Sequence, residues 1–557
     1  MSSLDWIILF GTLLLIVGYG VYKTKGSKNI ESYLKGDNSM KWWTIGLSIM
    51  ATQASAITFL STPGQAYNSG MGFIQFYFGL PLAMIILSIW VLPIFYKLKV
   101  YTAYEYLESR FDLKTRVLGA FLFLIQRGLA AGITIYAPAI ILSTILGWPL
   151  VYTTVVIGSL VIIYTVSGGT KAVSQTQQHQ MIVMMGGMIV AGLFVIKLLP
   201  EDIGLAEATK LAGHMGKLEL INTDLDLENR YTLWTGLLGG LFVALSYFGT
   251  DQSQVARYLS GKSLTESRLG LMFNGLLKIP MQFVILFIGA LVFVFYQFNQ
   301  APVFFNEAAK DEVYLYPVQK EKYQAVEKEY SNLFEEKRRQ VQLLSEAQGD
   351  EIQVLKQSIA QIHDQENQLR EEAKTIIKNT NEDLETTDTD YVFITFVMEN
   401  LPKGIIGLLL AVIFSAAMSS TASELNALAS TSIIDIYKRN IFQNGSERHY
   451  LIASKLFTLF WGIVAVLFAT FAGLLDNLIQ AVNILGSIFY GTILGVFLSG
   501  FFINYIKGNA VFIGALVAQA VVLYFYFFSE MAYLWFNLLG CGIVIMTGLV
   551  YQFFKNR

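Results

Sequence analysis

Long apolar stretches recur along almost the whole chain, and they constrain its fold more than any other feature. A helix that crosses a bilayer needs about 20 mostly apolar residues. The sequence contains thirteen such stretches, near residues 5–23, 43–62, 72–96, 117–143, 150–167, 175–198, 233–249, 269–297, 403–432, 451–472, 477–503, 509–527 and 532–553. Lipid offers no partner to backbone N–H and C=O groups, so segments of this kind fold as helices. The sequence therefore predicts an all-α polytopic membrane protein embedded in a lipid bilayer.

Composition agrees with this interpretation and excludes several other classes of protein. Only 14% of the residues are charged, against about 25% in soluble domains. The formal net charge of −2 gives no argument for a nucleic-acid partner, and Cys541 is the single cysteine, so no intrachain disulfide can form. The first stretch lacks a basic leader and a cleavage site, so we expect a retained helix and not a signal peptide.

Basic residues gather in alternate loops, which predicts the orientation of the chain. Lys and Arg occur in the loops near residues 23–41, 97–116, 257–268 and 438–448, and in the C-terminal tail. The opposite loops, near residues 63–71, 144–149, 473–476 and 528–531, contain neither residue. Cytoplasmic loops carry the excess of Lys and Arg. We therefore expect a multi-pass membrane protein, with the N-terminus outside and the C-terminus in the cytoplasm.

One segment, residues 301–390, differs from the rest of the chain. It holds 11 Lys/Arg and 20 Asp/Glu, and the topology puts it outside the cytoplasm. Apolar residues from Ile352 to Ile376 follow a 3,4 repeat, interrupted by Glu366 and Ala373. With a matching upstream helix and a turn at Gly349, the pattern predicts an antiparallel helical hairpin. A single solvated helix is the alternative, and a partner-binding role is possible but is not required by its residues.

Small hydroxyl residues fill the stretch from Phe414 to Ser423, inside the predicted span 403–432. Close packing of another helix against small residues is one explanation. The other is coordination of an ion, because a serine hydroxyl and a carbonyl oxygen are hard neutral ligands that suit Na⁺.

A second polar helix, residues 50–64, contains Thr and Gln and closes at Pro63-Gly64. Such a helix is a candidate for local unwinding, which is how secondary transporters build binding sites near the bilayer midplane. A plain kink is the alternative.

Arg127 lies about ten residues into the apolar stretch 117–143. A charge at that depth indicates a functional site. We expect no acidic side chain of the spans to pair with it, so a substrate carboxylate is its natural partner. Bonds to helix carbonyls or to water are the alternative, and Lys278 is interpreted as structural.

Several motifs together resemble the sodium:solute symporter family, which includes sodium/galactose, sodium/proline and sodium/sialic acid transporters. The resemblance covers essentially the whole membrane part. It is carried by Ala416–Ser420 with Asn426 and Asp435, Ala51–Ser55 with Pro63-Gly64, Gly168–Val173, Tyr247–Gln252 with Arg257, and Gly486–Gly491.

The resemblance implies the leucine-transporter fold, built from two inverted five-helix repeats. We expect the first helix and a cytoplasmic loop in 1–42, the first repeat in 43–198 and an extracytoplasmic loop in 199–232. The second repeat is expected in 233–503, interrupted by 301–390, and two C-terminal helices in 504–557.

The family's sodium site maps onto two segments of this chain. The resemblance implies that Na⁺ is bound by the backbone carbonyls of Ala51, Ala54 and Ala416 and the hydroxyls of Ser419 and Ser420. It also implies an aromatic inner gate, which matches Tyr247 and its neighbour Phe248.

Three departures from the family pattern change what we expect. Members with a second sodium site carry an aspartate where this chain has Gln177, and Ala422 replaces a serine of that site, although Ser423 remains. We therefore predict one coupling sodium per substrate. Ala244 replaces an asparagine of the hexose-transporting members, which weakens a galactose-like interpretation.

The bacterial sialic acid branch is the more similar one, which implies a protein of the bacterial inner membrane. It implies substrate contacts at Gln53, Ser55, Thr58, Gln75 and Arg127. We expect sodium-coupled import of a small polar solute, with a carboxylated sugar such as sialic acid favoured. A monocarboxylate, a neutral sugar or a polyol is the alternative, and a transporter-like sensor or scaffold is the alternative of another class. No span contains a catalytic set of side chains, so we expect no enzyme, and we expect the chain to act as a monomer.

Overall fold

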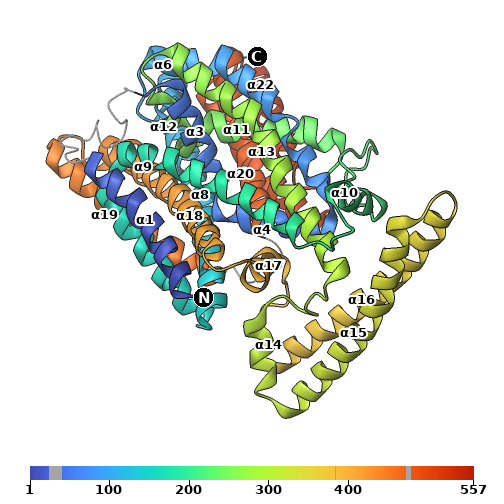
Figure 1. Ribbon diagram of the computed structural model, residues 1–557. Coiled ribbons are helices and arrows are strands. Elements are labelled where there is room, and N and C mark those ends of the chain that lie inside the picture. The colour runs from blue at the N-terminus through green and yellow to red at the C-terminus, as the bar shows by residue number, and fades with distance from the viewer. Residues whose placement is uncertain (24–39, 383, 472–477, 557) are drawn as a thin grey trace.

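The computed structural model describes residues 1–23, 40–382, 384–471 and 478–556. Within these ranges the β pairing is confined to an isolated bridge between Met40 and Gly261. The rest consists of helices and their connections, which confirms the all-α prediction (Figure 1). Most of the first basic loop, 24–39, and the short loop expected at 473–476 lie outside the described residues.

The first half of the chain builds helices that differ widely in length. They are α1 (Ser3–Lys23), α3 (Trp42–Gln53), α4 (Ala56–Ser69), η2 (Met71–Tyr77), α5 (Leu80–Ile86), η3 (Leu87–Val91), α6 (Leu92–Leu98), α7 (Glu105–Arg110), α8 (Leu113–Leu146), α9 (Leu150–Lys197), α10 (Leu205–His214), η4 (Thr235–Gly239), α11 (Gly240–Thr250) and α12 (Gln252–Leu259).

The second half begins with a helix of 35 residues and ends with two C-terminal helices. Its elements are α13 (Leu264–Phe298), α14 (Glu307–Tyr314), α15 (Pro317–Glu346), α16 (Glu351–Thr380), η5 (Thr389–Tyr391), α17 (Val392–Asn400), α18 (Ile405–Thr431), η6 (Ser432–Ile441), α19 (Glu447–Ala469), α20 (Leu478–Phe502), α21 (Gly508–Phe528) and α22 (Trp535–Lys555).

Nine helices of the described residues are long and apolar enough to cross a membrane. The consecutive helices α3 and α4 form a tenth candidate, bent by 61° at the break between them. The stretches 150–167 and 175–198, which were expected as separate spans, fall within the single element α9. The count of thirteen spans therefore stays a prediction, whereas the multi-pass character is clear.

Helices α3 and α4, on either side of the break, both pack against α13 and α18. Helix α18 also packs against α8 and α9. The contact between α13 and α4 is unusually close, because a Cβ atom on Gly289 would lie 2.3 Å from the carbonyl oxygen of Pro63. Small residues allow backbones to approach in this way.

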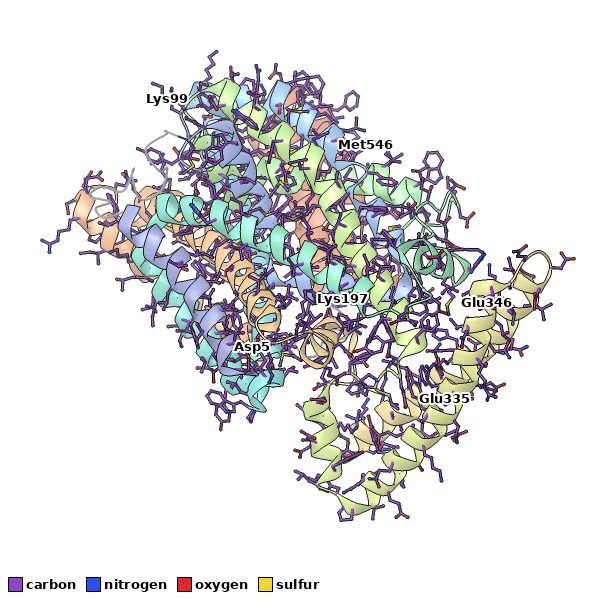
Figure 2. All side chains as sticks on the ribbon, viewed as in Figure 1. Asp5, Lys99, Lys197, Glu335, Glu346 and Met546 are labelled. Carbon is purple, nitrogen blue, oxygen red and sulfur yellow. The ribbon has the colours of Figure 1, made fainter. Side chains whose placement is uncertain are left out.

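Helices α15 and α16 form the predicted antiparallel hairpin, joined by a turn in which Gly349 has a φ of +62°. The hairpin projects away from the bundle (Figure 1). In Figure 2, Lys99 lies at one end of the bundle and Glu335 of the hairpin lies beyond the other. Glu366 and Ala373, which interrupt the apolar repeat, are buried on its face; Glu366 can be buried there because Lys337 Nζ donates to it at 2.5 Å.

Candidate functional site

The chain breaks its helix between α3 and α4, in the polar segment that the sequence singled out. Helix α3 ends at Gln53 and α4 begins at Ala56, so Ala54 and Ser55 lie between two helix ends. The Met50 carbonyl still accepts from the Ala54 N–H at 2.7 Å. The last carbonyl groups of a helix that ends in this way have no intrahelical donor and are available to other partners. The helix was expected to close at Pro63-Gly64, but Pro63 lies inside α4, which continues to Ser69. A break, and not a plain kink, is therefore present, although it lies earlier than expected.

The predicted sodium ligands come together where α18 crosses this break. The Ser419 hydroxyl donates to the Ala51 carbonyl at 3.2 Å, and the Ser420 hydroxyl donates to the Ala416 carbonyl at 2.9 Å. Ala51, Ala54 and Ala416 are fully buried, and both serines are 1% exposed.

These five residues offer neutral oxygen atoms only, which fits a monovalent hard cation better than Ca²⁺ or a transition metal. No group of three or more His, Cys, Asp or Glu side chains in the described part of the chain could hold a metal ion. A hydroxyl can turn its proton away from a cation and present a lone pair, so the set can change from mutual hydrogen bonding to ion coordination.

Gln177 on α9 fills the space beside these ligands. Its Nε2 donates to Ser423 Oγ at 2.8 Å, Thr52 Oγ1 at 3.1 Å and the Ser419 carbonyl at 3.3 Å, and its Oε1 accepts from Ser48 at 2.5 Å. A neutral amide thus links α3, α9 and α18 at the position where the resemblance places an aspartate of a second sodium site. One coupling sodium per substrate stays a prediction.

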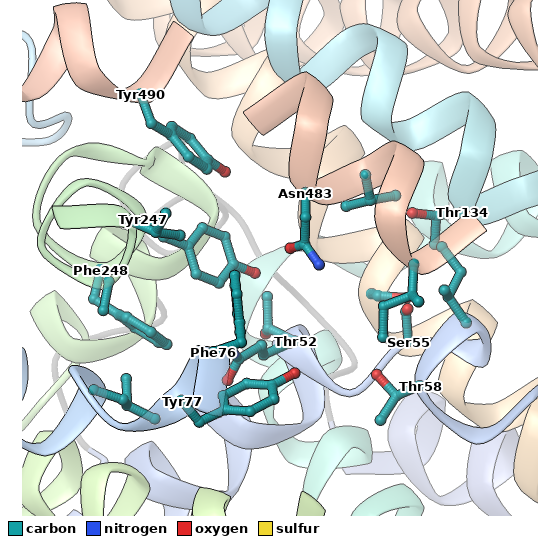
Figure 3. A pocket seen from close by; sticks show the side chains of 18 of the residues that line it. Thr52, Ser55, Thr58, Phe76, Tyr77, Thr134, Tyr247, Phe248, Asn483 and Tyr490 are labelled. Carbon is teal, nitrogen blue, oxygen red and sulfur yellow. The ribbon is translucent and has the colours of Figure 1, made fainter. Parts of the chain in front are cut away.

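A cavity of about 110 Å³ lies next to the break. Its lining includes the predicted substrate residues Gln53, Ser55, Thr58 and Arg127 and the predicted gate residues Tyr247 and Phe248. Figure 3 shows Tyr247 and Phe248 on one side of this pocket and Ser55 and Thr58 on the other. Residues that sequence reasoning did not assign to a site also line it, among them Thr134, Glu424, Asn483 and Tyr490.

Gln75 does not line this pocket, and its substrate contact stays a prediction. Its Nε2 donates to the Tyr231 carbonyl at 2.8 Å, and its Oε1 accepts from the Asn222 backbone at 3.0 Å. The 3₁₀ geometry of η2 turns the side chain toward the loop that follows α10, where it satisfies backbone groups.

Arg127 has two acidic partners, and the expectation that it has none is wrong. Its Nη1 donates to Glu424 Oε1 at 3.0 Å, and its Nη2 contacts Asp251 Oδ2 and the Tyr490 hydroxyl. Glu424 lies inside the predicted span 403–432, one helical turn after Ser420, and Asp251 belongs to the quoted motif Tyr247–Gln252. The positions of these two acidic residues in the sequence could therefore have identified them as partners of Arg127.

This cluster carries a net charge of −1 when both acids are ionised, because one guanidinium faces two carboxylates. The Tyr490 hydroxyl also donates to Asp251 at 2.9 Å, and Arg127 is 3% exposed. The guanidinium is nevertheless not saturated, since its buried Nε has no hydrogen-bond partner among the described residues.

Tyr247 is held in place at the edge of the pocket. Its hydroxyl accepts from Gln254 Nε2 at 2.6 Å, and its ring centre lies 5.3 Å from Arg127 Cζ and 4.9 Å from the Phe248 ring. These contacts fix an aromatic side chain at the wall of the pocket, and the gate role stays a prediction.

Comparison with known proteins places this geometry among ion-coupled transporters. Residues 33–313 and 380–518 match the model of the "Sodium:solute symporter family". The chain is 26% identical to the sodium/sialic acid symporter SiaT of Proteus mirabilis, over 98% of this chain and 94% of that protein. It is also 26% identical to the mouse sodium-coupled monocarboxylate transporter 1, over 93% of this chain and 72% of that protein.

A solved structure resembles the fold over nearly its whole length. It is the substrate-bound outward-open state of a Na⁺-coupled sialic acid symporter, with a TM-score of 0.77 and 24% identity, covering 99% of this chain and 98% of that one. The likeness confirms the predicted leucine-transporter type of fold. The family model leaves out residues 314–379, which contain α15 and nearly all of α16.

Proposed function

Because the chain belongs to the sodium:solute symporter family, we propose that it imports a small polar solute by coupling it to sodium entry. The contact between Ser419 Oγ and the Ala51 carbonyl carries this proposal, since it joins hydroxyls of α18 to a broken helix. Discontinuous helices of this kind form the ion and substrate sites of secondary transporters.

In this proposal Na⁺ is held by the carbonyls of Ala51, Ala54 and Ala416 and by the hydroxyls of Ser419 and Ser420. A cation there replaces the direct bond between Ser419 and Ala51 and ties α3 to α18. Sodium then favours one global state, the outward-open one, and raises the affinity for the solute by the same factor by which the solute raises sodium affinity. Loss of sodium to the cytoplasm reopens the inner side past Tyr247.

We propose the orientation that the charge bias predicts, with the N-terminus and the hairpin outside and the C-terminus inside. Residues 43–198 and 233–503 are then the two inverted repeats, and a monomer contains a complete pathway. Figure 2 is compatible with this orientation, because the basic residue Lys99 and the hairpin residue Glu335 lie at opposite ends of the molecule.

The favoured substrate is a carboxylated sugar such as sialic acid. Two observations support it: the similarity to a sodium/sialic acid symporter covers 98% of the chain, and Gln53, Ser55, Thr58 and Arg127 line one pocket. Amide and hydroxyl groups suit the sugar hydroxyls, and the free Nε of Arg127 is available to a carboxylate. The pocket must widen for such a ligand, because binding cavities for molecules of that kind start at about 300 Å³.

A smaller or neutral solute is the second candidate, and the Arg127 cluster favours it. Two carboxylates already neutralise the guanidinium, which disfavours a further anion. A cavity of about 110 Å³ also accepts a short monocarboxylate or a polyol with less rearrangement.

Uptake into proteoliposomes tests the proposal. Sialic acids, monocarboxylates, hexoses and polyols are supplied in turn, with an inward sodium gradient and with choline in its place. We expect accumulation of a carboxylated sugar only with the sodium gradient. Accumulation without sodium would contradict the coupling, and transport of polyols alone would shift the assignment to the second candidate.

A further inference from the structure

A second polar cavity, of about 280 Å³, lies between the hairpin and the membrane helices. Helices α4 and α13 and the loop after α10 form one wall, and α15, α16 and the chain before η5 form the other. The hairpin wall lies in the part of the chain that the family model leaves out. The cavity is therefore a feature added to the family's membrane core.

Positive charge exceeds negative charge in the lining of this cavity. Four basic side chains, Lys217, Lys337, Arg370 and Lys374, face three acidic ones, Glu366, Glu371 and Asp388. Three of the basic residues are paired: Lys337 with Glu366 at 2.5 Å, Arg370 with Asp388 at 2.7 Å, and Lys374 with Glu371 at 2.7 Å.

Lys217 is the basic residue of this lining for which the described part of the chain provides no carboxylate. It is 9% exposed, its Nζ donates to the Asn68 carbonyl at 2.6 Å, and it lies 4.4 Å from the centre of the Phe293 ring. Burial lowers the pKa of Lys217 to about 8, and the charge of Lys337 adds to this effect. An anion in the cavity would stabilise the charged form of Lys217.

The cavity also presents acceptors that have no donor. Gln297 Oε1 and Glu366 Oε1 are buried and have no hydrogen-bond partner among the described residues. Hydroxyl groups of a ligand would satisfy them. The rings of Tyr67, Tyr296 and Tyr330 supply apolar surface for the face of a sugar ring. The lining therefore fits a ligand that has one carboxylate, several hydroxyl groups and a partly apolar face.

We infer that this cavity is a second, sodium-independent binding site for the carboxylated sugar. The substrate binds there before it enters the membrane pocket. The inference rests on the proposed function. Asn68 and Thr58 both belong to α4 and are ten residues apart, which places the two sites about 15 Å apart along one helix. The connection before α17 is fixed to the same helix, since Asn68 Nδ2 donates to Thr389 Oγ1 at 2.7 Å.

Equilibrium binding of N-acetylneuraminic acid to the purified full-length protein tests the inference. Calorimetric titrations are run in sodium chloride and in choline chloride. We expect wild type to bind two equivalents with sodium and one without. Lys217→Gln should weaken the sodium-independent equivalent about tenfold or more, as expected for loss of a charge-assisted hydrogen bond, and should keep the sodium-dependent one. Lys217→Arg should keep both, and so should Lys210→Gln, an exposed control on α10.

A single equivalent in wild type, or unchanged sodium-independent binding in Lys217→Gln, would overturn the inference while uptake remained intact. Absence of both sodium-dependent binding and uptake would instead overturn the proposed function. If Lys217→Gln fails to fold, amine acetylation of wild type in choline replaces it. The ligand should protect Lys217 and not Lys210, and equal labelling of Lys217 with and without ligand would contradict the inference.

Discussion

The side-chain oxygen of Ser419 lies 3.2 Å from the carbonyl oxygen of Ala51, and this contact joins α18 to the last turn of α3. The two residues are 368 positions apart in the sequence. Any ion that binds both therefore couples one repeat of the proposed fold to the other. Four of the predictions below concern the groups around this contact and the pocket beside it.

Ser419→Ala should lower the affinity for sodium about tenfold, because one of five proposed ligands is lost. The maximal rate at saturating sodium should change much less. Sodium-dependent uptake in proteoliposomes measures both values. Ser430→Ala is the matched control, since Ser430 is buried on the same helix and donates to the Ala427 carbonyl at 2.9 Å. Wild-type sodium dependence in Ser419→Ala would show that the site is wrongly assigned.

Wild type should move one sodium per substrate, because the amide of Gln177 occupies the place of an anionic ligand. Gln177→Asp should create a second site beside Ser423 and raise the ratio toward two, as a carboxylate adds a strong cation ligand. Reversal potentials of proteoliposomes measure the ratio. Gln177→Asn, which stays neutral, is the control and should keep one sodium. A ratio of two in wild type would refute the prediction.

Glu424→Gln should raise the affinity for a carboxylated substrate by roughly tenfold or more. The change removes one of the two carboxylates at Arg127 and so removes repulsion against an incoming anion. Affinity for a neutral polyol should stay the same. Competition binding with paired acid and polyol ligands measures the difference. If the polyol gains as much as the acid, the effect is one of shape and not of charge.

Arg127→Gln should destabilise the protein by about 3–5 kcal/mol, because it leaves two buried carboxylates without their cation. The double variant Arg127→Gln with Glu424→Gln should recover part of this loss, since only Asp251 then stays unpaired. Unfolding followed in detergent with increasing denaturant compares the three proteins. No recovery in the double variant would indicate that Glu424 does not share the charge of Arg127.

The connection after the hairpin should make stability depend on pH. Removal of water raises the pKa of Glu385 to about 8, with nearby Asp390 adding to the effect, and burial raises the pKa of Asp390 to about 6. The Tyr136 and Tyr391 hydroxyls contact Glu385, and Leu478 N donates to Asp390 at 3.1 Å.

Raised carboxyl pKa values mean that the folded state favours the protonated acids. Their contribution to stability is therefore complete at low pH and is lost as the pH rises through about 6 for Asp390 and about 8 for Glu385. Glu385→Gln should raise the melting temperature at pH 9 and leave it nearly unchanged at pH 4. Glu382→Gln, at an exposed position of the same connection, should change neither value. Equal effects of Glu385→Gln at both pH values would contradict this account.

Local pattern was enough to predict the helical class, the membrane setting and the hairpin, because hydrophobic length and the 3,4 repeat report on each helix by itself. The polar helix 50–64 was also recognisable, but its break lies at Ala54-Ser55 and not at Pro63-Gly64. Proline tends to end or kink a helix, yet close packing against a neighbouring helix can keep it inside a continuous one. Close contact of Gly289 with Pro63 is such a case.

The amino-acid order alone showed which polar residues lie in apolar stretches: serines on α18, amides on α3 and α9, and Arg127 on α8. The partners of these residues follow from the three-dimensional packing. In the folded chain Arg127 pairs with two carboxylates, and Gln75 donates to the backbone of the loop after α10. Lys217 lines a cavity whose opposite wall is the hairpin. Pairing energies in a low-dielectric interior depend on distances between segments hundreds of residues apart, and a single chain carries no local signal for those distances.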